Sequence, residues 1–192
     1  MKRLSIEDLW SLEEYAKRRP QFRAEAIARK SLRRIQLGTH VTLQFEDELT
    51  VRYQVQEMLR IERTFEQDGI QAELDAYNPL LPDGTNLKAT MMIEYPDEAE
   101  RKIALANLVG IENCVWIRCG GIEVTAIADE DLDRSTEFKT SAVHFLRFEC
   151  PPGFSSVLKR GGPLIAGISH ARYDETTAVP KPIAEALSVD LA

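Results

Sequence analysis

The chain has 192 residues, of which 44% are hydrophobic and 29% are charged, and its formal net charge at pH 7 is −7. This composition is that of a globular protein of about one domain, and it excludes disordered and fibrous proteins. No apolar stretch approaches the roughly 20 residues that span a bilayer, and no apolar segment follows the basic start to make a secretory signal, so we expect a cytoplasmic protein.

Residues 3–34 predict an N-terminal helical hairpin. Ser5 and Asp8 have the spacing of a capping box ahead of a first helix. Pro20 is placed to end that helix and to open a second one at its first turn. We therefore expect two helices with a break between them at Pro20.

This N-terminal segment is basic, whereas the rest of the chain is acidic. Residues 1–34 contain 10 basic and 5 acidic residues, and the remaining residues carry a net charge of −12. We expect either a solvated basic face or a docking face for an acidic partner, to which Arg29, Arg33 and Arg34 would contribute. Nucleic acid is not expected as a partner, because the acidic remainder repels phosphate and no aromatic residues alternate with the basic ones.

Hydrophobic periodicity predicts the elements of the central part of the chain. Alternating apolar residues predict strands, and apolar residues at helical spacing predict helices. The expected strands are 34–37, 41–45 and 88–95, and the expected helices are 50–67, 70–76 and 96–109. A loop of about ten residues separates the second of these helices from the strand that follows it, and Pro82-Asp83-Gly84 within the loop fits a β-turn.

A hairpin is the clearest local prediction. Residues 114–119 and 122–127 flank Gly120-Gly121, the kind of dipeptide that makes a two-residue turn. Pairing Cys119 with Ile122 places the alternate apolar residues of both strands on one face, and a slip by one residue would destroy that agreement.

The remaining elements complete an α+β fold. Residues 141–150 and 163–169 predict two more strands, and we expect a single domain over 1–173 with a tail at 174–192 that is extended or forms a short docking helix. Helices come first and short hairpin connections follow. This order favours a mainly antiparallel sheet with an N-terminal helical hairpin and helices packed on the sheet.

The loop between residues 78 and 88 is the first candidate site. It gathers hydrogen-bonding side chains from Asn78, Asp83, Asn86 and Lys88, which can bind an anionic or carbonyl ligand. The alternative is a turn in which Asn78 and Asp83 bind their own backbone.

The helix at 50–67 is the second candidate. Glu57 and Arg60 have the spacing of an ordinary surface ion pair. Glu62 falls instead on the apolar stripe of this helix, where a carboxylate needs a cationic partner such as Lys88 or an arginine. We therefore expect the helix and the loop to line one site.

His144 is the third candidate, within the strand at 141–150. It is either a hydrogen-bonded core histidine or a metal-binding or proton-transferring residue. The Glu-x-x-His spacing of di-iron proteins does not occur, and the three cysteines form no Cys-x-x-Cys motif, so metal content and cofactor stay unknown. We expect the cysteines to be reduced thiols.

Several longer runs resemble an uncharacterised bacterial family, domain of unknown function 3501, over roughly residues 3–173. The runs that carry this resemblance are 53–63, 77–80, 86–95 and 139–148. The family has no established activity, so the resemblance implies no catalytic residues. Its genes are often neighbours of genes for rubrerythrin-like and iron–sulfur proteins, which implies a redox or oxidative-stress setting.

Two functions follow from these observations. The first is a non-catalytic accessory or binding protein that works with a rubrerythrin-like or iron–sulfur partner. The second is an enzyme or a small-ligand-binding protein, with or without a metal ion, whose site lies around the 78–88 loop and the 50–67 helix. The chain has no Gly-x-Ser-x-Gly motif and no nucleotide-binding loop, so whether it is an enzyme stays open.

Overall fold

The computed structural model describes residues 3–128 and 139–192 and consists of a body of two packed β-sheets and a projecting helical lobe. Within these residues, the first sheet has the strand order β1-β2-β3-β7-β6 and the second has the order β5-β4-β8-β9. All neighbouring strands are antiparallel. The α+β class with mainly antiparallel sheets is therefore confirmed.

The strands of the first sheet are β1 (Arg34–Leu37), β2 (Val41–Phe45), β3 (Asn86–Ile93), β7 (Val143–Glu149) and β6 (Ile127–Ala128). Those of the second sheet are β5 (Ile122–Thr125), β4 (Val115–Cys119), β8 (Leu164–His170) and β9 (Tyr173–Ala178). The α-helices are α1 (Leu12–Ser31), α2 (Glu48–Glu62), α3 (Gln67–Tyr77), α4 (Glu98–Asn107), α5 (Pro152–Lys159) and α6 (Lys181–Ser188). Short 3-10 helices lie at η1 (Ile6–Asp8), η2 (Asn78–Leu80) and η3 (Ile111–Cys114).

The predicted β4–β5 hairpin forms with the expected register. Cys119 pairs with Ile122, and Gly120 and Gly121 both have positive φ, at 58° and 80°. Such a turn needs this conformation at both central residues, which glycine adopts without steric cost. One residue after β5, the Ala126 N–H donates to the Val115 carbonyl at 2.8 Å, and the chain then continues as β6 in the other sheet. The chain thus joins the two sheets at Ala126.

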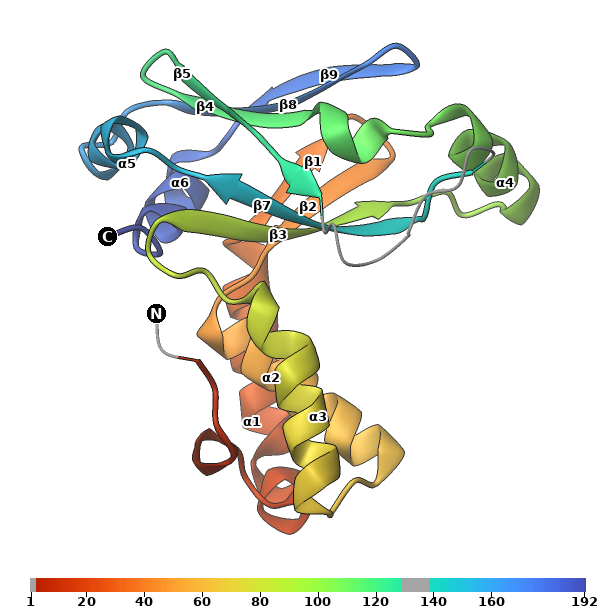
Figure 1. The fold of residues 1–192 in the computed structure, drawn as a ribbon, viewed down its shortest axis with the longest axis vertical. Helices are drawn as coiled ribbons and strands as arrows, with labels where there is room; N and C mark the ends of the chain where they lie inside the picture. Colours follow the sequence, from red (N-terminus) through yellow and green to blue (C-terminus); the bar gives the residue numbers. More distant parts are fainter. Residues whose placement is uncertain (1–2, 129–138) are drawn as a thin grey trace.

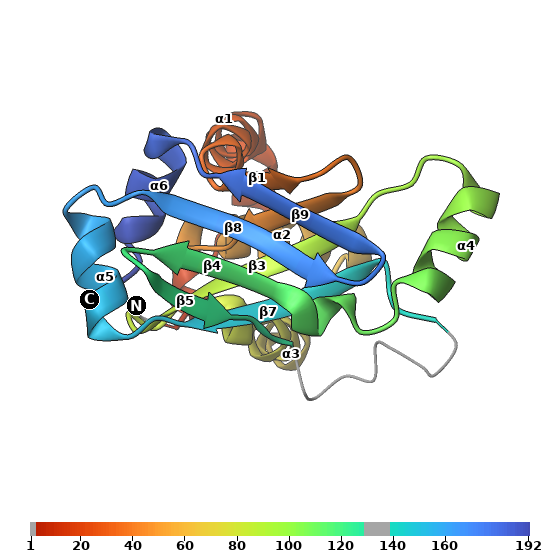
Figure 2. The ribbon, with the colours of Figure 1, turned by 90° about the horizontal axis from the view of Figure 1, so that it is seen from above.

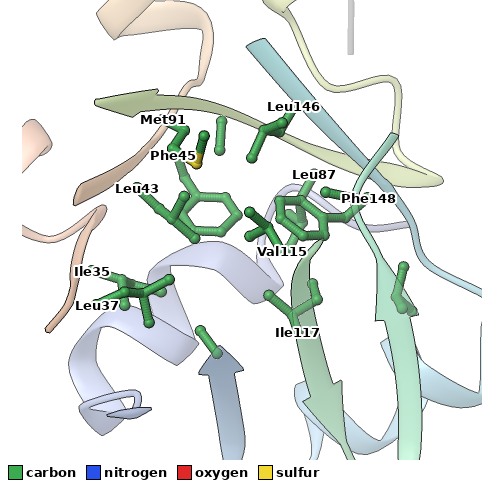
Figure 3. Close-up of a cluster of buried hydrophobic side chains, with 14 of the residues drawn as sticks. Ile35, Leu37, Leu43, Phe45, Leu87, Met91, Val115, Ile117, Leu146 and Phe148 are labelled. Atoms are coloured by element: carbon green, nitrogen blue, oxygen red, sulfur yellow. The ribbon is translucent and has the colours of Figure 1, made fainter. Parts of the chain in front are cut away.

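The main hydrophobic core lies between the two sheets. Apolar side chains at alternate positions of each strand turn inward, as the strand period of two requires. Figure 3 shows Leu43 and Phe45 of the first sheet facing Val115 and Ile117 of the second, with Phe148 beside them. All five side chains are fully buried.

The predicted break at Pro20 is wrong, because α1 is one continuous helix through Pro20. Proline removes one helical N–H and so costs a hydrogen bond in a helix interior. Ala16, whose carbonyl loses that donor, lies on the exposed side of α1, as does Pro20 itself. Tyr15 and Phe22 are buried on either side of the proline, and their packing holds the helix together across it.

The helical lobe consists of α1, α2 and α3 and has a hydrophobic cluster separate from the main core. Figure 1 shows these helices extending away from the two sheets. Buried apolar residues of the cluster come from the N-terminal segment, from α2 and α3, and from the loop that follows α3: Leu4, Val51, Val55, Leu59, Leu74, Leu80 and Leu81. Within the lobe α1 packs against α2, from which β1 and β2 separate it in the chain, and α3 packs on α2. None of the helices in the described residues is long and apolar enough to cross a bilayer.

Of the two forms expected for the C-terminal residues, an extended tail or a short docking helix, the structure shows a strand followed by a short helix that packs on the core. Residues 173–178 form β9, which pairs with β8 along its whole length. After it, α6 buries Leu187 in the main core, and Leu191 follows there. The tyrosine hydroxyl of Tyr173 also donates to the Leu37 carbonyl at 2.7 Å, which brings β9 beside β1. The sequence did not indicate this strand, because β9 exposes most of its side chains and its residues therefore show no alternation of apolar and polar types.

Candidate functional site

The 78–88 loop closes one side of a pocket of about 330 Å³. The lining residues are Arg3, Asn78, Pro79, Leu81, Pro82, Asp83 and Lys88. Three of the predicted site residues therefore do line a cavity. The 50–67 helix does not line it, and the N-terminal Arg3, which no pattern in the sequence singled out, does.

Asn78 acts as a clamp on the N-terminal segment. Its side-chain oxygen accepts a hydrogen bond from the Leu4 N–H at 2.8 Å, and its Nδ2 donates to the Leu4 carbonyl at 3.0 Å. Both contacts are buried, so this amide is committed to structure. The clamp also fixes the backbone beside Arg3, because Arg3 immediately precedes Leu4 in the chain.

Asp83 organises the turn at the mouth of the pocket. Its Oδ1 accepts from the backbone N–H and the hydroxyl of Thr85, at 2.8 and 2.7 Å, and its Oδ2 accepts from Asn86 Nδ2 at 2.9 Å. Asn86 Oδ1 in turn accepts from the Asp83 N–H at 3.2 Å. Burial raises the pKa of Asp83, but these hydrogen bonds and the positive charge of Lys88 outweigh it and hold the pKa below its ordinary value.

Glu57 lies in the helical lobe, away from this loop, and binds side chains of α1. Its carboxylate accepts from Arg19 Nε and Nη2 at 2.7 and 2.9 Å and from the Tyr15 hydroxyl at 2.7 Å. Arg60, one turn further along α2, adds two contacts of 3.3 Å. The hydrogen bonds from Arg19 lower the pKa of Glu57 to about 2, with Tyr15 and Arg60 contributing against the opposing effect of burial. Glu57 thus joins α1 to α2.

We expect Glu57→Gln to lower the free energy of unfolding at pH 7 by about 1.5–3 kcal/mol, because charge-assisted hydrogen bonds from Arg19 are lost. A carboxylate whose pKa is lowered by folding stabilises above its ordinary pKa of 4.5, and that stabilisation is lost as the pH falls towards 2. The difference between wild type and variant should therefore shrink over this window in urea titrations. Glu62→Gln, at an exposed carboxylate of the same helix, is the control. It should change neither the free energy of unfolding at pH 7 nor its pH dependence. An equal pH dependence in the two variants would contradict this role of Glu57.

The expectation for Glu62 is wrong. Its position matches the apolar stripe of α2, but it is the last residue of that helix and is exposed. The chain turns at Arg63, which has a left-handed φ of 56°, and the Glu62 side chain stays exposed near Glu73 and Tyr77 of α3. An exposed carboxylate needs no buried cation, and Lys88 lies beside Asp83 instead.

His144 is buried between β7 and η3, in a third place. Its Nε2 lies 2.8 Å from the Thr140 hydroxyl, 3.0 Å from the Ser141 carbonyl and 3.9 Å from Glu112 Oε2. The Thr140 hydroxyl also donates to Glu112 at 3.3 Å. A histidine that is 2% exposed within such a network favours the hydrogen-bonded core interpretation.

The thiols and carboxylates of the described residues form no group of three or more that could hold a metal ion. The three cysteines are free, and burial raises the pKa of each thiol, that of Cys150 to about 12. A thiol with a raised pKa holds little thiolate at neutral pH and is a poor nucleophile.

The predicted site residues thus lie in three separate places, and their partners were not visible in the sequence. Arg19 and Tyr15 are spaced like ordinary surface and core positions of α1. Neither Arg3 nor Glu112 belongs to a recognisable motif. Each becomes recognisable only when strands and helices distant in the sequence pack together.

Comparison with known proteins identifies a family and similar solved structures. The family model described as protein of unknown function (DUF3501) matches residues 3–191. A crystal structure of a protein of unknown function from Burkholderia pseudomallei is similar to this chain, with 51% sequence identity, a TM-score of 0.94, and 100% of both chains covered. No protein with a curated description matches the sequence.

Proposed function

The chain belongs to the DUF3501 family of proteins of unknown function, and on that basis we propose that it is a non-catalytic accessory protein that docks onto a redox protein through its helical lobe. The partner would be a rubrerythrin-like or an iron–sulfur protein. This choice of partner rests on the setting of the family, and the docking surface rests on the geometry of the lobe.

The observation that carries the proposal is the far end of the lobe. Figure 1 shows the α2–α3 connection at the end of the lobe that lies away from the sheets. Ile61 and Phe65 lie at this connection and are 61% and 68% exposed. Large apolar side chains at a projecting end are typical of protein-docking surfaces, whose energetic centres are enriched in aromatic residues.

The three arginines that the sequence suggested for docking form ion pairs within the protein. Arg33 is fully buried and contacts Asp190, Arg29 forms an ion pair with Asp47, and Arg34 lies 3.3 Å from Glu94. These arginines are engaged within the protein, so we place the docking contact at the apolar end of the lobe.

We also propose that the protein acts in the cytoplasm. Its thiols are free, and a reducing compartment keeps buried thiols in that state.

The docking proposal is tested with purified rubrerythrin-like and iron–sulfur proteins from the same organism, immobilised one at a time. We expect wild-type protein to bind one of them, and the Ile61→Ser/Phe65→Ser variant to bind it roughly ten-fold or more weakly, the usual cost of losing a hot-spot pair. Ile103→Ser removes a similarly exposed apolar side chain from α4 and is the matched control, which should bind like wild type. The proposal would be refuted if the wild type bound neither partner, or if the wild type and both variants bound the partner equally.

A further inference from the structure

We propose that the pocket between Arg3, the 78–88 loop and Lys88 binds a small organic anion whose charged head is a carboxylate or a phosphate. This site is separate from the docking end of the lobe, and the inference does not depend on the proposed partner. It is carried by the charges that line the pocket, by the way they are held, and by the apolar residues of the same lining.

Two cations, Arg3 and Lys88, line this pocket. The Asn78 clamp fixes the backbone of Leu4, the residue that follows Arg3, and Lys88 belongs to β3. Lys88 is also the cross-strand partner of Arg147 in β7, whose own charge is paired with Glu149, so the charge balance of the pocket is set by its lining residues. Asp83 is the acidic residue of the lining, so positive charge exceeds negative charge among the lining residues. An excess of positive charge in a concave site attracts anions.

The amide and the carboxylate of the pocket already form hydrogen bonds within the protein. The Asn78 amide is bonded to Leu4, and Asp83 accepts from Thr85 and Asn86. An ammonium has three N–H donors and a guanidinium has five, so Lys88 can contact Asp83 and still donate to a ligand, as can Arg3. The side chains that can orient a ligand are therefore cationic. Carboxylate and phosphate oxygens are the acceptors that pair with them most strongly.

The lining of the pocket also includes apolar residues with restricted backbones. These are Pro79, Leu81 and Pro82, and the ring of each proline limits its backbone to one range of φ. A volume of about 330 Å³ lies at the lower end of the usual range for ligand sites. The pocket thus suits a small molecule with an anionic head against Arg3 and Lys88 and an apolar body against the prolines.

Titration of the full-length protein with benzoate, phenyl phosphate and neutral benzamide tests the inference, with amide chemical shifts as the readout. We expect both anions to bind, with shift changes concentrated at residues 78–88 and around Arg3, and benzamide to bind at least roughly ten-fold more weakly because it lacks the charge. A preference for benzoate would identify the head as a carboxylate, and a preference for phenyl phosphate would identify it as a phosphate.

Variants locate the charges that bind the ligand. Lys88→Met and Arg3→Gln should each weaken anion binding by roughly ten-fold, since each removes a charge-assisted contact. Arg23→Gln, an exposed arginine of α1, is the matched control and should leave affinity unchanged. Circular dichroism of each variant confirms that it is folded. Absence of anion binding to the wild type, equal binding of benzamide, or wild-type affinity in the folded Lys88→Met and Arg3→Gln variants would each overturn the inference. None of these results bears on the docking proposal, which uses a different surface and a protein partner.

Discussion

Replacing Arg33 with methionine is expected to lower the free energy of unfolding by about 3–5 kcal/mol, the usual cost of breaking a buried ion pair from one side. The Arg33 guanidinium is fully buried. It donates to the Glu46 carbonyl at 3.0 Å and to the Ala186 carbonyl at 3.2 Å, and it forms ion pairs with Asp190 and Asp47. Methionine fills similar space but leaves two buried carboxylates without this cation.

Chemical denaturation of three variants measures this effect. Arg34→Met is the control, because Arg34 is half-exposed beside Glu94 and exposed ion pairs contribute about 0–1 kcal/mol. The double variant Arg33→Met/Asp190→Leu should recover part of the loss, since it also removes a carboxylate that burial would otherwise penalise. If Arg33→Met cost no more than Arg34→Met, the network would not hold α6 to the rest of the protein.

Leu187→Ala is expected to lower the free energy of unfolding by about 2–5 kcal/mol, as for other buried leucines. Leu187 is 0% exposed and packs into the main core from α6, although it belongs to a segment that the sequence assigned to a tail. Its truncation removes buried apolar surface and leaves a cavity that the surrounding strands cannot fill.

Val189→Ala provides a matched control two residues away. Val189 is 74% exposed, so the same kind of truncation there should change stability by less than about 0.5 kcal/mol. Urea titrations of the two variants give the comparison. Equal stabilities would show that α6 rests on the surface without contributing to the core.

Local pattern was sufficient for most of the strands and for one hairpin. Apolar residues alternate in 41–45 and 115–119, and two glycines at 120 and 121 leave one favourable register, so neighbouring residues contain the necessary information. Pro20 was misread because local propensity counts the missing N–H but not the packing of Tyr15 and Phe22, which outweighs it.

Local pattern also located part of the pocket but not its full lining. The unusual polarity and length of the 78–88 loop pointed to a pocket, and the loop does line one. Its association with the 50–67 helix was wrong, because Glu62 is exposed and the pocket has no lining residue from that helix among the described residues. Arg3 reaches the pocket because its neighbour Leu4 forms a buried hydrogen bond with Asn78, 74 residues away.

The sequence by itself therefore determined the α+β class, the strand alternation, the hairpin register and the position of a polar loop, all of which depend on residues within a few positions of one another. Only the tertiary structure decided which charges are buried and what they contact. Arg33 and Arg34 are adjacent and chemically identical, yet the first is buried against Asp190 and the second lies in solvent beside Glu94. The physical reason is that the free energy of a charge depends on its surroundings, and those surroundings are assembled from segments far apart in the chain.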